Sequence, residues 1–203
     1  MCGYSHIGFK EIETERGTYL TECHHLLRWK DMSIRKRRRE ECNIPIIYRG
    51  LTLPEVSAAD IDAKSLRAII KAIRQGTSLN IIGGSTQLAS AIGNTLIKLR
   101  RAVRYTTAAE LAAELRYTAE NYMERLRYYR EIEVLIIDEF GLERRSEYTD
   151  EQLYIILGHR RRNGYQTIIM SEDSERSEVI ERELKGIESV INGRVAKPLK
   201  WSG

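Results

Sequence analysis

The feature that most constrains the fold is the run VLII at Val134–Ile137, an apolar stretch without a polar interruption. A strand that is apolar on both faces has to be covered on both faces, which is typical of a parallel sheet. Parallel strands need crossover connections, and these are usually helices. We therefore expect a chain in which strands alternate with helices around one central sheet.

Hydrophobic periodicity predicts this alternation over most of the chain. The fold class is therefore α/β, with residues 43–203 forming a three-layer domain around a mostly parallel five-stranded sheet. The expected helices cover residues 62–75, 86–101, 108–130, 149–162 and 175–187, and the expected strands are Leu79–Ile82, Val103–Thr107, Val134–Ile137, Thr167–Met170 and Val195–Trp201.

The chain before this domain differs in composition. Residues 1–42 are polar, and we interpret them as a small N-terminal extension. The segment Asn43–Val56 contains Pro45 and Pro54. Because a residue that precedes proline avoids the helical conformation, this segment is predicted to be an extended connector.

Positive charge is concentrated in the N-terminal extension. The net charge of the 203-residue chain is only +4, but between Arg28 and Arg39 seven lysines and arginines accompany a single acid, Asp31. Such a run suits a phosphate-rich partner such as DNA or RNA, and it also suits a solvated helix face or a flexible arm. No apolar run is long enough to span a bilayer, and the N-terminus lacks a signal-peptide core, so we expect a soluble cytoplasmic protein without a membrane partner.

Two acids follow the VLII strand directly, at Asp138 and Glu139. In an α/β sheet this position lies at the carboxyl edge, where ligands bind. In a P-loop ATPase the aspartate at this point holds Mg²⁺, and the next glutamate polarises the water that attacks the γ-phosphate. An acidic turn without a catalytic role is the alternative interpretation.

The segment Gly83-Gly84-Ser85-Thr86 has the layout of a phosphate-binding loop between a strand and a helix. Gly83 and Thr86 match the first glycine and the final hydroxyl residue of the motif GxxxxGK[ST]. The intervening positions are about four fewer than in the motif, and the lysine that reaches the β- and γ-phosphates is missing. We therefore expect binding of ATP and Mg²⁺ to be weak or absent.

Several segments in the same order resemble one known family. They are LASAIGN at Leu88–Asn94, TTAAELAAEL at Thr106–Leu115, LIIDEFG at Leu135–Gly141, and an Arg-Asn-Gly turn before TIIMS at Thr167–Ser171. Together they resemble the DnaC/IstB branch of AAA+ ATPases, over about residues 43–201. This branch contains bacterial and phage helicase loaders and the ATPase subunits of IS21-type transposons. The NIP..Y connector and the apolar segment ending in Trp201 are more similar to the loaders.

The resemblance assigns roles to part of the site. It implies that Asp138 corresponds to the Mg²⁺-holding aspartate and Glu139 to the catalytic glutamate. Thr86 corresponds to the hydroxyl that binds Mg²⁺, provided that the short loop still positions it. Gly83, Gly84 and Ser85 would form what remains of the nucleotide-binding loop.

Two further positions depart from the family pattern. Glu172 stands where the family has its sensor asparagine, and an acid there would repel the γ-phosphate. Val190, in Ser189–Ile191, stands where the arginine finger is expected, and the nearby Arg194 is out of register. These departures and the missing lysine indicate that the phosphate-handling groups have been lost while the scaffold is kept.

The resemblance also raises the question of a zinc site in residues 1–42. Loader relatives often carry two cysteine pairs around a hairpin, which suggests a zinc ribbon; here Ser5 replaces one cysteine and a hairpin-like stretch surrounds Gly17. The remaining candidates would complete a tetrahedral set, and the alternative is a relic with free thiols and solvated histidines. The candidate zinc ligands are Cys2, His6, Cys23 and His25.

Two other clusters have simpler explanations. Cys42 lies outside the zinc pattern and is expected to be a small buried residue. The run His159–Arg162 ends a predicted helix, where cations are favoured; a subunit-interface or DNA contact by one of its arginines is the alternative.

The sequence therefore favours a DnaC-like replication protein, encoded by a phage or prophage, that binds a replicative helicase and single-stranded DNA with impaired ATP binding and hydrolysis. Three alternatives stay open: an active ATPase with a rearranged loop, an IstB-like transposition helper, and a degraded remnant without activity. Assembly with further copies of the chain is also left open.

Overall fold

The computed structural model describes residues 9–14, 17–22, 41–61, 63–116, 121–142, 146–171, 188–191 and 194–195. In the N-terminal extension, β1 (Phe9–Thr14) and β2 (Gly17–Glu22) form an antiparallel hairpin with Phe9 opposite Glu22. The turn therefore lies at the position where the sequence suggested a hairpin, just before Gly17.

Four of the five predicted strands are observed in the sheet of the main domain, and they run parallel to one another. Their order is β4-β5-β6-β3, so the strand before the candidate loop and the strand before Asp138 are separated by β6. A crossover order of this kind places loops from non-adjacent strands at the same carboxyl edge. The strands are β3 (Leu79–Ile82), β4 (Val103–Thr107), β5 (Val134–Phe140) and β6 (Gln166–Ser171).

The predicted fifth strand, Val195–Trp201, is not observed. Val195 belongs to the two-residue strand β8 (Arg194–Val195), and residues 196–203 lie outside the described part of the chain. The strand parallel to β3 on its other side is instead β7 (Glu188–Ile191), and β8 runs antiparallel to β7. The described sheet therefore has six strands in the order β4-β5-β6-β3-β7-β8.

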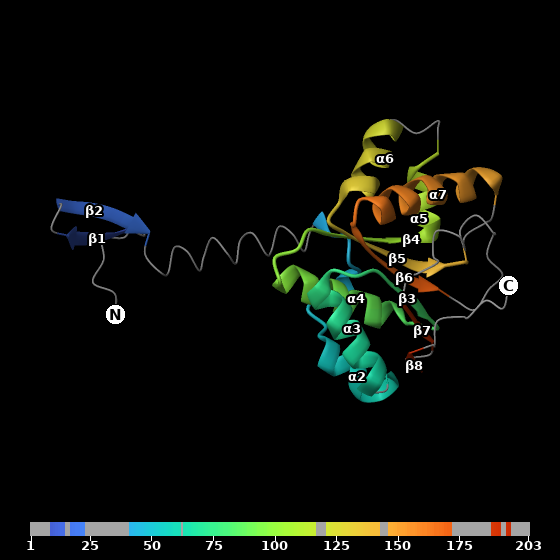
Figure 1. The fold of residues 1–203 in the computed structure, drawn as a ribbon, viewed down its shortest axis with the longest axis horizontal. Helices are drawn as coiled ribbons and strands as arrows, with labels where there is room; N and C mark the ends of the chain where they lie inside the picture. Colours follow the sequence, from blue (N-terminus) through green and yellow to red (C-terminus); the bar gives the residue numbers. More distant parts are fainter. Residues whose placement is uncertain are drawn as a thin grey trace.

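Helices cover both faces of the sheet, which gives the expected three layers (Figure 1). The side chains of β5 alternate between two buried clusters: Val134 and Ile136 pack on one face, and Leu135 and Ile137 on the other. One face carries α2 (Leu53–Asp60), α3 (Ala63–Gln75) and α4 (Thr86–Lys98), and the other carries α5 (Ala108–Glu114), α6 (Tyr122–Glu131) and α7 (Glu147–Arg162).

The prediction of an extended connector at 43–56 was wrong. The segment contains the short 3₁₀ helix η1 (Ile46–Tyr48) and the start of α2, where Pro54 lies in the first helical turn. Proline is tolerated there because the first backbone N–H groups of a helix have no intrahelical partner. Thr52 and Glu55 form a capping box at this end, with the Thr52 amide donating to Glu55 Oε2 over 2.7 Å.

The predicted continuous helix 108–130 is two helices. Leu115 caps α5, and Asn121, at φ 65°, precedes α6 in the left-handed conformation. Residues 117–120 lie outside the described part of the chain. Leu111 and Leu126 still pack into one cluster, so the apolar periodicity reported a shared buried face and not an unbroken helix.

Two smaller expectations can be compared directly. Cys42 is buried, as predicted, and burial raises the pKa of its thiol. Among the described residues, no helix is both long and apolar enough to cross a membrane.

Candidate functional site

The candidate site lies at the carboxyl edge of the central strands. The loop after β3, the end of β5 and the end of β6 come together there because the three strands are parallel. The Gly83 amide donates to the Ser171 carbonyl over 2.8 Å, and the Ser171 hydroxyl donates to Asn80 Oδ1 over 2.9 Å. The ends of β3 and β6 are therefore joined directly below the loop.

The loop itself consists of Gly83, Gly84 and Ser85, because β3 ends at Ile82 and α4 begins at Thr86. Gly83 has φ +69°, which glycine adopts without strain. A Cβ on Gly84 would lie 2.9 Å from both Ile81 Cγ2 and Met170 Cε. The loop is therefore packed against the strand ends and does not arch away from the sheet.

Gly84→Ala is accordingly expected to lower the free energy of unfolding by about 1–3 kcal/mol, since the added methyl group overpacks this contact. Urea unfolding followed by circular dichroism measures the change. An alanine variant as stable as the wild type would show that the loop has room beneath it.

Ser85 uses its side chain to begin α4. Its hydroxyl accepts a hydrogen bond from the Leu88 amide over 3.2 Å, and its carbonyl accepts one from the Ala89 amide over 3.0 Å. In a phosphate-binding loop the amides at the start of the helix point to the anion. Here the chain itself satisfies the Leu88 amide.

Asp138 is 2% exposed, and both of its oxygens accept hydrogen bonds. Oδ1 accepts from the Glu139 amide over 2.9 Å, and Oδ2 accepts from the hydroxyl of Tyr105 on β4. The Thr86 side chain lies near the same hydroxyl and works against the rise in the pKa of Tyr105. A phenol therefore lies beside both groups that the family resemblance assigns to Mg²⁺.

Sequence reasoning missed Tyr105 and treated VRYTT only as a strand. β4 pairs with β5, and Thr107 lies opposite Asp138 in the parallel register. Tyr105 is two residues earlier on the same face as Thr107, so its long side chain reaches the carboxylate. Burial, followed by the hydrogen bond to Asp138, raises the pKa of Tyr105 well above the ordinary value of 10.0, so the phenol stays a neutral donor.

Glu139 differs from Asp138 in exposure and in backbone conformation. It is exposed and has φ 55°, and it lies in an irregularity of β5 pairing between Ile137 and Phe140. Positive φ is uncommon for residues other than glycine and is often associated with functional or strained sites. The bulge separates the two acids, since Asp138 is held inside and Glu139 faces solvent.

Of the remaining predicted site residues, only Val190 and Arg194 lie in the described part of the chain, and both are in strands of the sheet. Val190 pairs with Ile81 inside the sheet, and Arg194 pairs with Ile191. Glu172 and the candidate zinc ligands Cys2, His6, Cys23 and His25 lie outside the described residues. Within the described ranges, no group of three or more His, Cys, Asp or Glu residues could hold a metal ion.

The cluster His159–Arg162 divides into different environments. Arg160 is fully buried, and its guanidinium donates to Thr167 Oγ1 and to the carbonyls of Tyr129, Ile132 and Gln166 over 2.6–2.9 Å. An interface or DNA contact by Arg160 is therefore excluded in this fold, whereas Arg161 and Arg162 are exposed.

These contacts bear on whether ATP and Mg²⁺ fit the residues present. The loop is packed against the sheet, and Gly83–Thr86 contains no cation to balance a triphosphate. The Tyr105 hydroxyl occupies one oxygen of Asp138 and lies near Thr86. As arranged, the side chains do not fit a tightly bound nucleotide and its metal ion.

Solved structures with the same fold include several replication proteins. The chain is similar to DnaI, with a TM-score of 0.60 and 21% identity over 73% of this chain and 94% of that one. For the DnaC helicase loader the TM-score is 0.55, with 16% identity over 73% and 99% of the two chains. For a putative primosome component from Streptococcus pyogenes serotype M3 it is 0.56, with 20% identity over 79% and 97%.

At these identities the structural likeness establishes a shared fold and nothing more. No curated protein sequence is significantly similar to the chain. The family described as IstB-like ATP binding protein matches residues 48–177, more than half of the 203 residues. This range contains the loop after β3, the β4 tyrosine and both acids of β5, which confirms the resemblance drawn from the motifs. The chain therefore belongs to the IstB-like ATP-binding protein family.

Proposed function

We propose that this chain is a helicase-loader type of IstB-like protein that works without nucleotide, as an adaptor between a replicative helicase and single-stranded DNA. The observation that carries the proposal is the Tyr105 hydroxyl, which donates to Asp138 and lies near Thr86. The fold likeness to DnaI and to the DnaC helicase loader supports the loader side.

The tyrosine argues against a metal ion at this point for a geometric reason. Mg²⁺ requires oxygen ligands at about 2.0–2.1 Å in near-octahedral geometry. To admit the ion, the Tyr105 hydroxyl would have to leave Asp138, and the Tyr105 residue is only 3% exposed. The neutral phenol already satisfies the carboxylate without a cation, so metal binding would have to replace existing hydrogen bonds.

Under this proposal the site residues are remnants of an ATPase. Thr86 and Asp138 are former Mg²⁺ ligands, Glu139 is the former catalytic glutamate, and Gly83–Ser85 is a shortened loop. We further propose that residues 1–42 form the helicase-binding extension, with or without zinc, and that residues 43–203 form the AAA+ domain.

Capture of the replicative helicase encoded in the same genome by the full chain tests the adaptor role. We expect equal capture with ATP, with ADP and without nucleotide, because the loop makes no use of the γ-phosphate. Capture that depends on ATP would contradict nucleotide independence. Absence of capture in all three conditions would remove the loader function itself.

Thermal unfolding with and without MgATP tests the nucleotide site separately. A site whose dissociation constant is one hundredth of the ligand concentration would add about 2.7 kcal/mol of stability. We expect no measurable change at about 1 mM MgATP and a dissociation constant weaker than about 1 mM for a fluorescent ATP analogue. Micromolar affinity would favour an active ATPase with a rearranged loop.

A transposition helper is the second candidate, because the matched family is named after the IstB protein. This function predicts capture of a transposase, and not of the helicase, by the same full-length chain. Capture of the helicase alone would favour the loader.

A further inference from the structure

The exposed face of α3 carries a stripe of cations. Lys64, Arg67, Lys71 and Arg74 are spaced three, four and three residues apart, and all four are exposed. This spacing places them within an arc of about 80° on a helix of 3.6 residues per turn. The sequence of α3 contains no aspartate or glutamate, so this face has one sign of charge.

The opposite face of α3 fixes the stripe in place. Ser65, Ile69, Ala72 and Ile73 are buried, and the last three belong to the hydrophobic cluster beneath the sheet. The helix is therefore anchored along its length, and its exposed cations are presented by a rigid backbone. Binding through such a face requires little ordering of the main chain.

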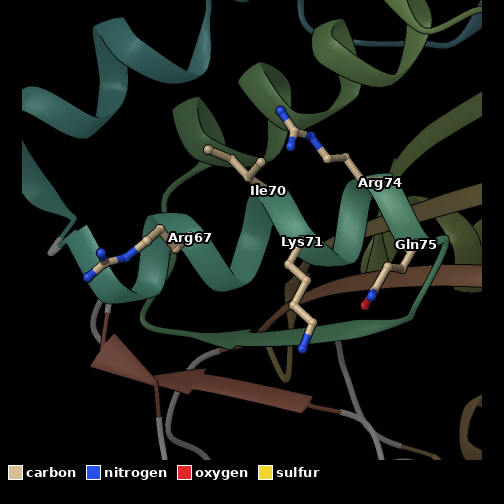
Figure 2. Close-up of a pocket in the computed structure, with 5 residues that line it drawn as sticks. All are labelled: Arg67, Ile70, Lys71, Arg74 and Gln75. Atoms are coloured by element: carbon tan, nitrogen blue, oxygen red, sulfur yellow. The ribbon is translucent and has the colours of Figure 1, made fainter.

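A pocket of about 300 Å³ lies along this stripe (Figure 2). Among the described residues, its lining consists of the three cations Arg67, Lys71 and Arg74 together with Ile70 and Gln75, and contains no acid. Within the described part of the chain these three cations form no ion pair. By contrast, Arg101, Arg104, Arg125 and Arg127 each pair with a glutamate.

We propose that three cations of this stripe, Arg67, Lys71 and Arg74, bind the phosphates of a single-stranded DNA backbone. We call these three residues the α3 site. Cations three and four residues apart on a helix have Cβ atoms about 5–6 Å apart, so a single line of them can follow a single line of phosphates. Contacts to phosphates alone carry no sequence information, so we expect this binding to be independent of DNA sequence.

The packing of α3 against the rest of the domain favours binding of single-stranded DNA over duplex DNA. A helix that reads duplex DNA enters the major groove, which requires it to protrude from its domain. Leu66, Ala68 and Ile70 on the flanks of α3 are half-buried, so the helix presents one shallow face and not a full cylinder. This inference rests on the proposed function. It places the DNA contact of that function on α3, outside residues 1–42.

The test is a salt titration of binding by the full chain to a fluorescent oligothymidylate. The triple variant R67Q/K71Q/R74Q is compared with K98Q/R116Q/R127Q, which removes the same charge from three exposed positions outside α3. Losing three phosphate contacts should reduce the slope of log K against log salt by about 2, because each contact to a single strand contributes about 0.7. Affinity at about 0.1 M salt should then fall about 100-fold, while the control changes little.

Three outcomes would overturn the site: an unchanged slope in the α3 variant, an equal loss in the control variant, or an equal effect on binding to a matched duplex. Helicase capture by the α3 variant separates this inference from the proposed function, and we expect it to be retained. Wild-type chain that does not bind the oligonucleotide would refute both the α3 site and the DNA part of the proposed function. Binding that is insensitive to α3 would refute the α3 site alone.

Discussion

Replacing Arg160 with methionine should lower the free energy of unfolding by about 3–6 kcal/mol, the largest effect we expect from one substitution. The guanidinium is fully buried and donates to three carbonyls and one hydroxyl. Methionine fills a similar volume but leaves these acceptors without a donor, at about 1–3 kcal/mol for each group that stays unsatisfied. The carbonyls belong to the backbone, so no second substitution can remove them.

Urea unfolding measures this effect, and Arg162→Met is the matched control. Arg162 is two residues away, exposed, and in the same helical turn as Arg160, so its loss should change stability by no more than about 0.5 kcal/mol. Burial lowers the pKa of Arg160 to about 9, which still leaves the guanidinium charged at neutral pH. A cost below about 1 kcal/mol for Arg160→Met would mean that water replaces the lost donors.

Tyr105→Phe is expected to lower stability by about 2–3 kcal/mol, because it removes a donor to a buried carboxylate. It also has a signature in the pH dependence. The pKa of Tyr105 is raised in the fold, so the unfolded chain releases this proton first as the pH rises. The stabilisation is complete below about pH 10 and is lost progressively above it, by up to about 1.4 kcal/mol per pH unit.

The alkaline slope of unfolding free energy against pH should therefore be shallower in Tyr105→Phe than in the wild type. Tyr129 provides a comparison, since burial, followed by a hydrogen bond to Glu114, raises its pKa to about 12. Tyr129→Phe should also lose part of the slope but leave Asp138 satisfied. A Tyr105→Phe variant with the wild-type slope would show that the phenol is not held as a donor.

Magnesium provides a second measurement on the same variant. In Tyr105→Phe the phenol no longer donates to Asp138, so Mg²⁺ should stabilise this variant more than it stabilises the wild type. Equal stabilisation of both proteins would weaken the argument that the phenol takes the place of the ion.

The local pattern of the sequence was sufficient for the central part of the fold. The strands at Leu79–Ile82, Val103–Thr107 and Val134–Ile137 could be located because each is a short segment rich in β-branched residues and bounded by helices or turns. The apolar pattern missed the strand Glu188–Ile191, because this segment is short and of mixed polarity. It is recognisable as a strand only through its pairing with β3. The local pattern also failed at Pro54, where proline begins a helix instead of preventing one.

For the site, the family, the short loop without lysine and the pair Asp138-Glu139 could be found in the sequence. These are properties of neighbouring residues, and they are read directly from the chain. Two features became visible only in the folded domain: Tyr105 donates to Asp138, and Arg160 is an internal donor while Arg162 faces solvent. Both outcomes depend on strand pairing and helix packing between segments distant in sequence, and such contacts leave no periodic signal in the chain.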